Sequence, residues 1–270
     1  MNSRELVVIG CGNMGSAIIK AILKQGIIVK EKLIVIEKTP NKFTEDLKSQ
    51  KVAILSSLSR LNSNIKTVIL AVKPQAVKET LNPLSVKVDK NSLVISIMAG
   101  VTVGFLKENL PKAQIVRTMP NTPCSINQGM TAYFGDQNVT EESFEFTKEI
   151  LESIGEAVKV DDENLMDAVT AISGSGPAYV FYLAEALNDA ALQMGLNAEQ
   201  SKILSRQTML GASSLLANSS LDAKKLRENV TSKGGTTEAA IKHFNEMHIK
   251  ENMIDAFKKA WQKSIELGKS

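Results

Sequence analysis

The chain has 270 residues, 43% of them hydrophobic and 23% charged, which is typical of a soluble globular protein with one large or two modest domains. Its net charge of +3 and the absence of a run of Lys and Arg argue against a nucleic-acid partner. Only two His and two Cys are present, and their spacing matches neither a structural zinc site nor a disulfide scaffold, so we expect no metal centre and no His-centred triad.

The first residues, MNSRELVVIG, lack the cationic region and apolar segment that are typical of a signal peptide. The longest uncharged stretches, Thr118–Gly135 and Ala168–Ala184, are interrupted by Pro, Gly, Asn and Ser and do not fit a membrane span. We therefore expect no membrane partner, a cytoplasmic location and reduced thiols.

Up to about residue 160, short β-branched runs alternate with helix-like segments. The predicted strands are Leu6–Ile9, Leu33–Ile36, Thr67–Val72, Leu93–Ile97 and Gln114–Arg117. Helical spacing follows over Met14–Gln25, which ends at Gly26, and again over Thr140–Ile154. Strands alternating with helices indicate a doubly wound, mostly parallel α/β sheet, and we place this domain at residues 1–161.

After Asp161 the strand patterns stop. The predicted helices are Leu165–Ile172, Ala178–Met194, Ala198–Leu216, Ala223–Val230, Glu238–Phe244 and Lys250–Leu267. Residues 162–270 are therefore predicted to form a second, all-helical domain. Because no flexible linker precedes it, we expect it to pack directly on the first domain.

A glycine-rich turn links the first predicted strand to the first predicted helix. Its sequence, GCGNMG, contains Gly10, Gly12 and Gly15, and it also brings Cys11, Asn13 and Met14 to the start of the helix. In this context the first glycine permits the tight turn, the second lets a pyrophosphate approach the backbone, and the third allows close packing of the helix on the sheet. The pattern predicts dinucleotide binding, with phosphates on the N–H groups of the helix start.

Glu37 ends the second predicted strand. A carboxylate there can accept hydrogen bonds from the adenosine ribose hydroxyls, which favours NADH. Lys38 and Thr39 follow directly, and a cation with a hydroxyl can instead hold the 2′-phosphate of NADPH. A solvated strand end is the plain alternative. The sequence leaves the choice between NADPH and NADH open.

Two further loops follow predicted strands at the same edge of the sheet. Ala71, Val72, Lys73 and Pro74 end the Thr67–Val72 strand, and Ala99 and Gly100 follow the Leu93–Ile97 strand. Ligands of open α/β sheets lie outside the carboxyl ends of the strands. We therefore expect the first loop to contact the cofactor and the small residues of the second to leave room for the nicotinamide ring.

A second glycine turn, TSKGGTT at residues 231–237, joins two predicted helices. The backbone N–H groups of Gly235, Thr236 and Thr237 are placed to hold a carboxylate at a helix start. The alternative is a glycine C-cap followed by a Ser/Thr N-cap with no ligand. Local physics alone favours that alternative.

Six motifs in chain order resemble the pyrroline-5-carboxylate reductase family: GCGNMGSAI, AVKPQ, SIMAGVT, RTMPNTP, SGSGPAYVF and LRENVTSKGGTTEAAI. The resemblance runs from Leu6 to Leu267, and VTSxGGTT is its most specific part. It implies an N-terminal Rossmann domain and a C-terminal helical domain that dimerises by interlocking helices, with larger rings of dimers in some members. It also implies hydride transfer from NADPH or NADH to the C5 imine of L-1-pyrroline-5-carboxylate, giving L-proline.

The resemblance assigns the substrate carboxylate to the N–H groups around Gly235–Thr237, and the ring nitrogen to the Thr237 hydroxyl, which would also help deliver a proton. The other expected substrate contacts are Asn229, Ser232, Gly234 and Glu163. Glu163 would favour a cationic ring, although a solvated helix-start carboxylate is the stronger interpretation. Asn121 either shapes the pocket or forms a turn beside prolines.

The chain departs from the family pattern at two positions. Lys233 stands where proline is usual, and Met98 stands where alanine is common, so that Met98 would narrow the nicotinamide pocket. Two other functions remain: a related dehydrogenase, and a catalytically silent nucleotide-binding protein. Hydroxyacid dehydrogenases of similar plan use a lysine in the long interdomain helix, and Ala178–Met194 contains none. A silent protein would not need the Gly234–Thr237 turn.

Overall fold

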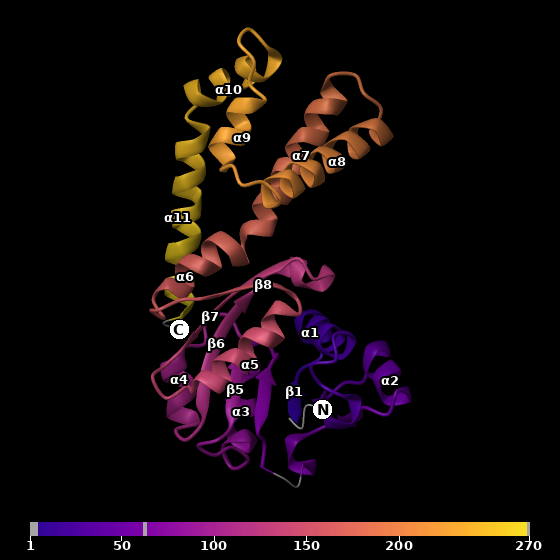
Figure 1. The fold of residues 1–270 in the computed structure, drawn as a ribbon, viewed down its shortest axis with the longest axis vertical. Helices are drawn as coiled ribbons and strands as arrows, with labels where there is room; N and C mark the ends of the chain where they lie inside the picture. The colour runs from indigo at the N-terminus through magenta and orange to yellow at the C-terminus, as the bar shows by residue number, and fades with distance from the viewer. Residues whose placement is uncertain (1–4, 62–63, 269–270) are drawn as a thin grey trace. The chain divides into compact units, whose positions relative to one another are not determined.

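The computed structural model describes residues 5–61 and 64–268. By contacts, these residues form two compact units (Figure 1). The first comprises residues 5–174 together with 260–268, and the second comprises residues 175–259. The chain thus divides later than the boundary predicted after Asp161, because the segment that follows Asp161 packs with the sheet and the end of the last helix contacts that segment, where the Ser264 hydroxyl donates to Asp167 at 2.7 Å.

The first unit is built on one eight-stranded sheet in the order β3-β2-β1-β4-β5-β6-β7-β8. The strands are β1 (Leu6–Ile9), β2 (Leu33–Ile36), β3 (Ala53–Leu55), β4 (Thr67–Leu70), β5 (Leu93–Ser96), β6 (Gln114–Pro120), β7 (Gly129–Gly135) and β8 (Gly155–Lys159). Leu6 pairs with Leu33 on one side and with Thr67 on the other, so the strand order reverses at β1. Only β6 and β7 pair antiparallel among the described strands, which confirms the doubly wound, mostly parallel sheet.

Helices cover both faces of this sheet. They are α1 (Asn13–Lys24), α2 (Lys42–Ser49), α3 (Val77–Ser85), α4 (Val103–Asn109), α5 (Glu141–Glu152) and α6 (Leu165–Val169), the last continuing into a π-helical turn, η5 (Thr170–Gly174). Because side chains alternate along a strand, Val8 of β1 joins the core under α1 and α5, whereas Val7 joins the core under α3 and α4. Each fully buried aliphatic side chain there stabilises the fold by about 1.5–3 kcal/mol.

The five predicted strands of this unit are present, and so are the three predicted helices that fall in it, with ends shifted by up to three residues. The helices α2, α3 and α4 were not predicted by range. Three strands were not predicted. β3 has three residues and none of them is buried, and β8, GEAVK, is also without a buried residue. β7 has buried residues, but its sequence GMTAYFG has no continuous apolar run.

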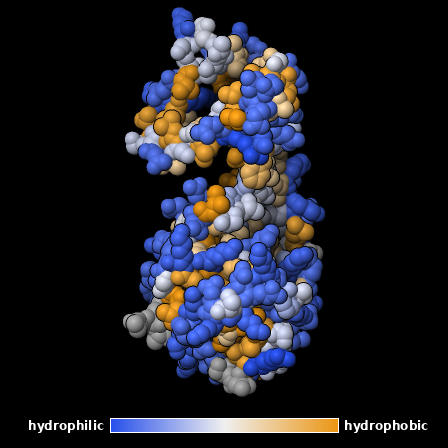
Figure 2. Space-filling model, turned by 90° about the vertical axis from the view of Figure 1, so that its right-hand side faces the viewer, coloured by the Kyte–Doolittle hydropathy of each residue, from blue (hydrophilic) through white to orange (hydrophobic). Residues whose placement is uncertain are grey.

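The second unit contains helices only. They are α7 (Gly176–Gln193), α8 (Ala198–Ala217), α9 (Ala223–Asn229), α10 (Thr236–Glu246) and most of α11 (Ile249–Gly268), as predicted. α7 and α8 lie side by side (Figure 1). No residue of α7 is buried, and Phe181 and Tyr182 are 64% and 75% exposed. Apolar side chains gather on the surface of this unit (Figure 2), so its helices present an apolar face with no covering element in the described chain.

Candidate functional site

The turn between β1 and α1 depends on two glycines. Gly10 has a φ of +97°, and a Cβ there would lie 2.5 Å from the carbonyl oxygen of Ala71. A Cβ on Gly15 would lie 2.3 Å from the carbonyl oxygen of Gly10 and 3.2 Å from the Ala71 Cβ. Gly10 therefore makes the turn, and Gly15 brings α1 close to the end of β4, in the roles that the sequence predicts.

Gly12 has a different role. Its φ is −71°, which any residue adopts, and a Cβ built on it would meet no atom of the described chain within 4 Å. It is the N-cap of α1, its carbonyl accepts from the Ser16 N–H, and none of the described side chains caps the helix. The N–H groups of Asn13 and Met14 thus begin a helix with open space in front of it. This arrangement fits the pyrophosphate of a dinucleotide.

Glu37 lies beside this turn. Its Oε2 accepts a hydrogen bond from the Cys11 N–H at 2.7 Å, and its Oε1 accepts one from the Thr39 N–H at 3.2 Å. Lys38 forms an exposed ion pair with Glu79 of α3. The three residues predicted to contact the ribose are therefore together at the end of β2, but they already have partners within the chain.

The loops after β4 and β5 lie at the same edge of the sheet. The Ala71 N–H donates to the Ile9 carbonyl at 2.8 Å, and the Ile97 N–H donates to the Leu70 carbonyl at 3.1 Å. In the first loop Val72 and Pro74 are half-buried and Lys73 is exposed; in the second, Ala99 is exposed. Both loops have accessible residues at the edge of the sheet where the glycine turn lies, as the prediction requires.

Met98 is an exception among these residues. It is 2% exposed and packs in the core under α3 and α4, with neighbours such as Val94 and Leu106. The expectation that its side chain narrows a pocket at this edge is therefore wrong. Met98 follows the end of β5 and directly precedes Ala99. Of these two residues, the smaller one, Ala99, is exposed at the surface.

Glu163 is partly buried and forms an ion pair and a hydrogen bond within the chain. Its Oε1 accepts from Arg117 Nη1 at 2.9 Å and from the Val103 N–H at 2.7 Å. The Arg117 side chain, on β6, is 7% exposed, and that of Glu163 is 24% exposed. The interpretation of Glu163 as a solvated helix-start carboxylate is therefore wrong. The carboxylate instead neutralises a buried guanidinium and caps the N-terminus of α4.

Asn121 joins three segments of the first unit. Its Nδ2 donates to the Ser173 carbonyl at 3.1 Å, and its Oδ1 accepts from the Met130 N–H at 2.9 Å. The amide thus holds the RTMPNTP loop to β7 and to the start of the SGSGP segment. The side chain has a structural role that neither interpretation of the sequence included.

The second glycine turn joins α9 to α10. Gly234 has a φ of +75°, and its N–H donates to Glu238 Oε2 at 2.7 Å. The Gly235 N–H donates to the Ser232 carbonyl at 3.0 Å, so one of the three N–H groups predicted to hold a carboxylate is already used. The Gly235 carbonyl accepts the first hydrogen bond of the helix, from the Ala239 N–H. The N–H groups of Thr236 and Thr237 lie at the helix start, where no carbonyl of the helix can accept from them.

Gly235 is the N-cap of α10, and the described residues provide no side-chain cap for this helix. The Ser or Thr N-cap that the ligand-free alternative expected for α10 is therefore wrong. α1 and α10 share the same arrangement: a glycine N-cap with no side chain on the free N–H groups. This is what a helix needs in order to bind an anion.

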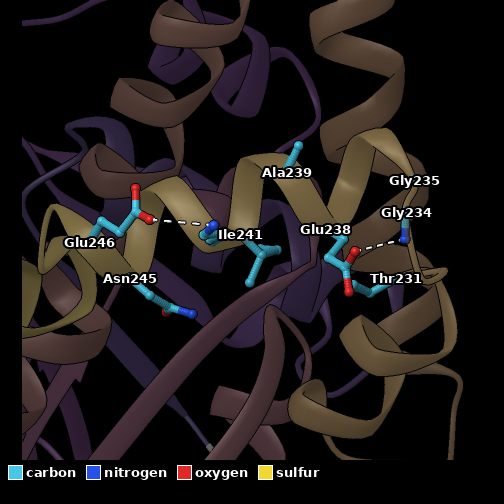
Figure 3. Close-up of a pocket in the computed structure, with 9 residues that line it drawn as sticks. Thr231, Gly234, Gly235, Glu238, Ala239, Ile241, Asn245 and Glu246 are labelled. Atoms are coloured by element: carbon cyan, nitrogen blue, oxygen red, sulfur yellow. Dashed lines mark hydrogen bonds and ion pairs between the residues drawn. The ribbon is translucent and has the colours of Figure 1, made fainter.

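A pocket of 680 Å³ lies along this turn and the adjoining face of α10 (Figure 3). Its lining residues are Thr231, Gly234, Gly235, Glu238, Ala239, Ile241, Lys242, Asn245 and Glu246. Thr237 is half-buried, whereas Asn229, Ser232 and Thr236 are exposed. The turn is thus accessible within its own unit.

Other candidate chemistry is sparse in the described residues. Cys11 and Cys124 are free and buried, and burial raises the pKa of both thiols. Within residues 5–61 and 64–268, no group of three or more His, Cys, Asp and Glu side chains is placed to hold a metal ion. None of the helices in those residues has the length and apolar character that crossing a membrane requires.

Comparison with known proteins supports the resemblance to the pyrroline-5-carboxylate reductase family. Residues 163–267 match the model described as pyrroline-5-carboxylate reductase dimerisation, and residues 5–100 match the model described as NADP oxidoreductase coenzyme F420-dependent. A pyrroline-5-carboxylate reductase from Haemophilus influenzae is 37% identical over 99% of this chain and 98% of its own length.

Solved structures give the same result. A pyrroline-5-carboxylate reductase from Coxiella burnetii superposes with a TM-score of 0.91 at 33% identity, covering 98% of this chain and 99% of its own. A pyrroline carboxylate reductase from Plasmodium falciparum, solved with NADP bound, has a TM-score of 0.86 at 32% identity and covers 99% of both chains. The chain therefore belongs to the pyrroline-5-carboxylate reductase family.

Proposed function

We propose that this chain reduces L-1-pyrroline-5-carboxylate to L-proline with NADPH or NADH, the last step of proline biosynthesis. The observation that carries the proposal is the uncapped start of α10 behind Gly234 and Gly235. A protein that only bound a dinucleotide would need the β1–α1 turn but not this second anion site. The two turns together match the two reactants, a dinucleotide and a small carboxylate.

The chemistry requires little from the side chains. The bound cofactor supplies a hydride to the C5 carbon while the imine nitrogen gains a proton, so the C=N bond becomes a C–N single bond and NAD(P)⁺ is left. The chain's task is to hold both reactants in register, and orientation of this kind lowers a barrier by several kcal/mol. The scarcity of His and Cys is compatible with this task.

The substrate is held at the second turn. The N–H groups of Thr236 and Thr237 donate hydrogen bonds to the substrate carboxylate, and the hydroxyl of Thr237 hydrogen-bonds the ring nitrogen and passes it a proton that solvent replaces. Asn229, Ser232 and Gly234 complete the contacts around the ring. Glu163 is not among them in this proposal, because its Oε1 accepts from both Arg117 and Val103, which holds the side chain in the first unit.

The cofactor is held at the β1–α1 turn and the neighbouring strand ends. The pyrophosphate lies in front of Gly12, and the ribose lies near Glu37. The remaining contacts are Gly10, Cys11, Asn13, Met14, Gly15, Lys38, Thr39, Ala71, Val72, Lys73, Pro74 and Ala99. In this assignment residues 1–161 bind the cofactor and residues 162–270 provide the substrate site and the dimer contacts.

The chain is proposed to act as a homodimer in the cytoplasm. The apolar side chains of α7 and α8 that remain exposed, such as Phe181, give a face that a second copy would cover. The match of residues 163–267 to a dimerisation model supports this choice. A higher oligomer of dimers is the next larger state, and a solution mass measurement distinguishes the two.

The test is oxidation of NADH or NADPH in the presence of L-1-pyrroline-5-carboxylate, followed by the absorbance of the reduced nicotinamide. Turnover that yields L-proline is expected with at least one cofactor. The absence of turnover with both, in a protein that still binds the cofactors, would favour a silent nucleotide-binding protein. Oxidation of a hydroxyacid would favour a dehydrogenase, for which α7 provides no lysine.

A further inference from the structure

The Glu37 carboxylate is fixed beside the glycine turn. Both of its oxygens accept a backbone N–H, one from Cys11 within the turn at 2.7 Å and the other from Thr39 at 3.2 Å. Because these donors come from both sides of the strand end, the carboxylate does not need a ligand to hold it there. It is therefore part of the surface next to the proposed pyrophosphate site, where the adenosine ribose of a dinucleotide would lie.

A fixed carboxylate distinguishes a ribose hydroxyl from a phosphate. A carboxylate only accepts hydrogen bonds, and its two oxygens have about four lone-pair positions, so Glu37 can still accept from the 2′- and 3′-hydroxyls. A 2′-phosphate offers no hydroxyl at that position and brings a charge of about −2 close to the carboxylate. The geometry of Glu37 therefore favours the cofactor that lacks this phosphate.

The backbone N–H groups and the cation that could bind a 2′-phosphate here are already used, which leaves the exposed Thr39 hydroxyl. The N–H groups of Cys11 and Thr39 both point at Glu37. The Lys38 ammonium, the nearest cation in sequence, pairs with Glu79 of α3. That pair is exposed and weak by itself, but it places a second carboxylate beside the cation. Glu37, Lys38 and Glu79 together carry a formal charge of about −1 before any cofactor binds.

We propose that Glu37, with Glu79 holding Lys38, makes NADH the preferred cofactor of this chain. The inference rests on the proposed function only in assuming that the β1–α1 turn binds a nicotinamide dinucleotide. The Plasmodium falciparum relative was solved with NADP bound, so the preference belongs to residues 37–39 and 79 of this chain and not to the family.

The experiment measures binding without substrate, by calorimetric titration of the full chain with NADH and with NADPH at low ionic strength. Because no turnover is needed, failure of the reductase assay does not affect the result. The wild type is expected to bind NADH at least about tenfold more tightly. Glu37→Gln is expected to shift the ratio of the two dissociation constants toward NADPH by about tenfold or more.

Glu31→Gln is the matched control. It removes the same charge at the other end of β2, where Glu31 is exposed in the short 3₁₀ turn Lys30–Lys32. The ratio is expected to stay within about twofold of the wild type, since exposed charges a strand length away are largely screened. Equal or tighter binding of NADPH by the wild type would overturn the proposal. An unchanged ratio in Glu37→Gln, or an equal shift in Glu31→Gln, would overturn it too.

Glu79→Gln tests the second part separately and does not disturb the glycine turn. Release of Lys38 is expected to strengthen NADPH binding severalfold and leave NADH binding unchanged. If NADPH binding does not change, Glu79 has no part in the preference and Glu37 alone remains. If both cofactors change equally, the effect is general electrostatics and the assignment of Glu79 is wrong.

Discussion

Arg117 Nη1 lies 2.9 Å from Glu163 Oε1, and this ion pair joins β6 to the segment that leads into α6. The same oxygen also accepts the Val103 N–H at the start of α4. One carboxylate therefore connects a central strand, a covering helix and the connecting segment. Arg117 is largely buried, so its charge depends on Glu163, its ion-pair partner among the residues that the structure describes.

We expect Glu163→Ala to lower the free energy of unfolding by about 2–3 kcal/mol. Removal of one partner of a buried pair leaves an uncompensated charge, which costs about 3–5 kcal/mol when burial is complete, and the Glu163 side chain is 24% exposed. Urea unfolding measures the difference. The control is Glu152→Ala in the exposed pair with Lys148, where a loss below about 0.5 kcal/mol is expected. Similar losses in both variants would contradict a special role for Glu163.

Variants of two glycines in the first turn are expected to affect stability and cofactor binding differently. Gly15→Ala places a Cβ 2.3 Å from the Gly10 carbonyl oxygen, so a loss of about 2 kcal/mol in the free energy of unfolding is expected. Gly12→Ala meets open space and should change stability by less than about 0.5 kcal/mol.

For cofactor binding, the variant with the small effect on stability is expected to have the large effect. Gly12→Ala is expected to raise the dissociation constant of NADH by about tenfold or more, because the added methyl occupies the space assigned to the pyrophosphate. Calorimetric titration measures that constant, and urea unfolding measures stability in the same samples. If Gly12→Ala binds NADH like the wild type, the pyrophosphate does not lie in front of α1.

The central strands were predictable because their burial is visible in their own sequences. Every residue of β1, β4 and β5 is buried, and a strand covered on both faces is a continuous apolar run. β8 lies at the end of the sheet order, and its residues GEAVK are exposed or half-buried. An edge strand of this kind is defined by its neighbour, which a local pattern does not show.

The same distinction applies to the candidate site. The glycine turn and Glu37 were predictable because their geometry follows from spacing along a strand–turn–helix unit. The Arg117–Glu163 pair joins residues 46 positions apart, and the amide of Asn121 meets Ser173 at a separation of 52. No local pattern indicates such partners, so Glu163 was assigned a solvated or substrate-binding role. The Met98 prediction failed because side-chain direction at a strand end depends on the tertiary core.

Thr237 is the residue whose side chain is proposed to contact the reacting atoms. We expect Thr237→Ala to lower kcat by about 10²-fold, the usual effect of losing a group that assists proton transfer. Thr237→Ser keeps the hydroxyl and should retain most of the activity. Steady-state kinetics with L-1-pyrroline-5-carboxylate measures both, and titration with NADH should give the wild-type dissociation constant.

Thr236→Ala is the control for Thr237. Both residues contribute a backbone N–H at the start of α10, but only Thr237 has a proposed side-chain role, so Thr236→Ala should keep kcat within about threefold of the wild type. If the two alanine variants lose the same activity, the turn acts through its backbone alone and Thr237 is not catalytic.

The two buried thiols predict a loss of stability at high pH. Burial raises the pKa of Cys11 and Cys124 above the ordinary value of 9.0, and the Ser16 and Thr131 hydroxyls oppose this only in part. Below 9.0 the thiols are protonated in both states and pH has no effect through them. Above 9.0 the unfolded chain loses these protons first, so the free energy of unfolding falls as pH rises, by at most about 1.4 kcal/mol per pH unit for each thiol.

Urea unfolding at about pH 8 and about pH 10 measures this fall, in the wild type and in the double variant Cys11→Ala, Cys124→Ala. The variant starts from a lower stability because two buried side chains are truncated, but that cost is the same at both pH values. Lysine and tyrosine titrations are shared by both proteins, so only the difference between the two falls belongs to the thiols. The variant should lose less stability than the wild type over this interval. An equal fall would mean that both thiols ionise as readily in the folded chain as in the unfolded one.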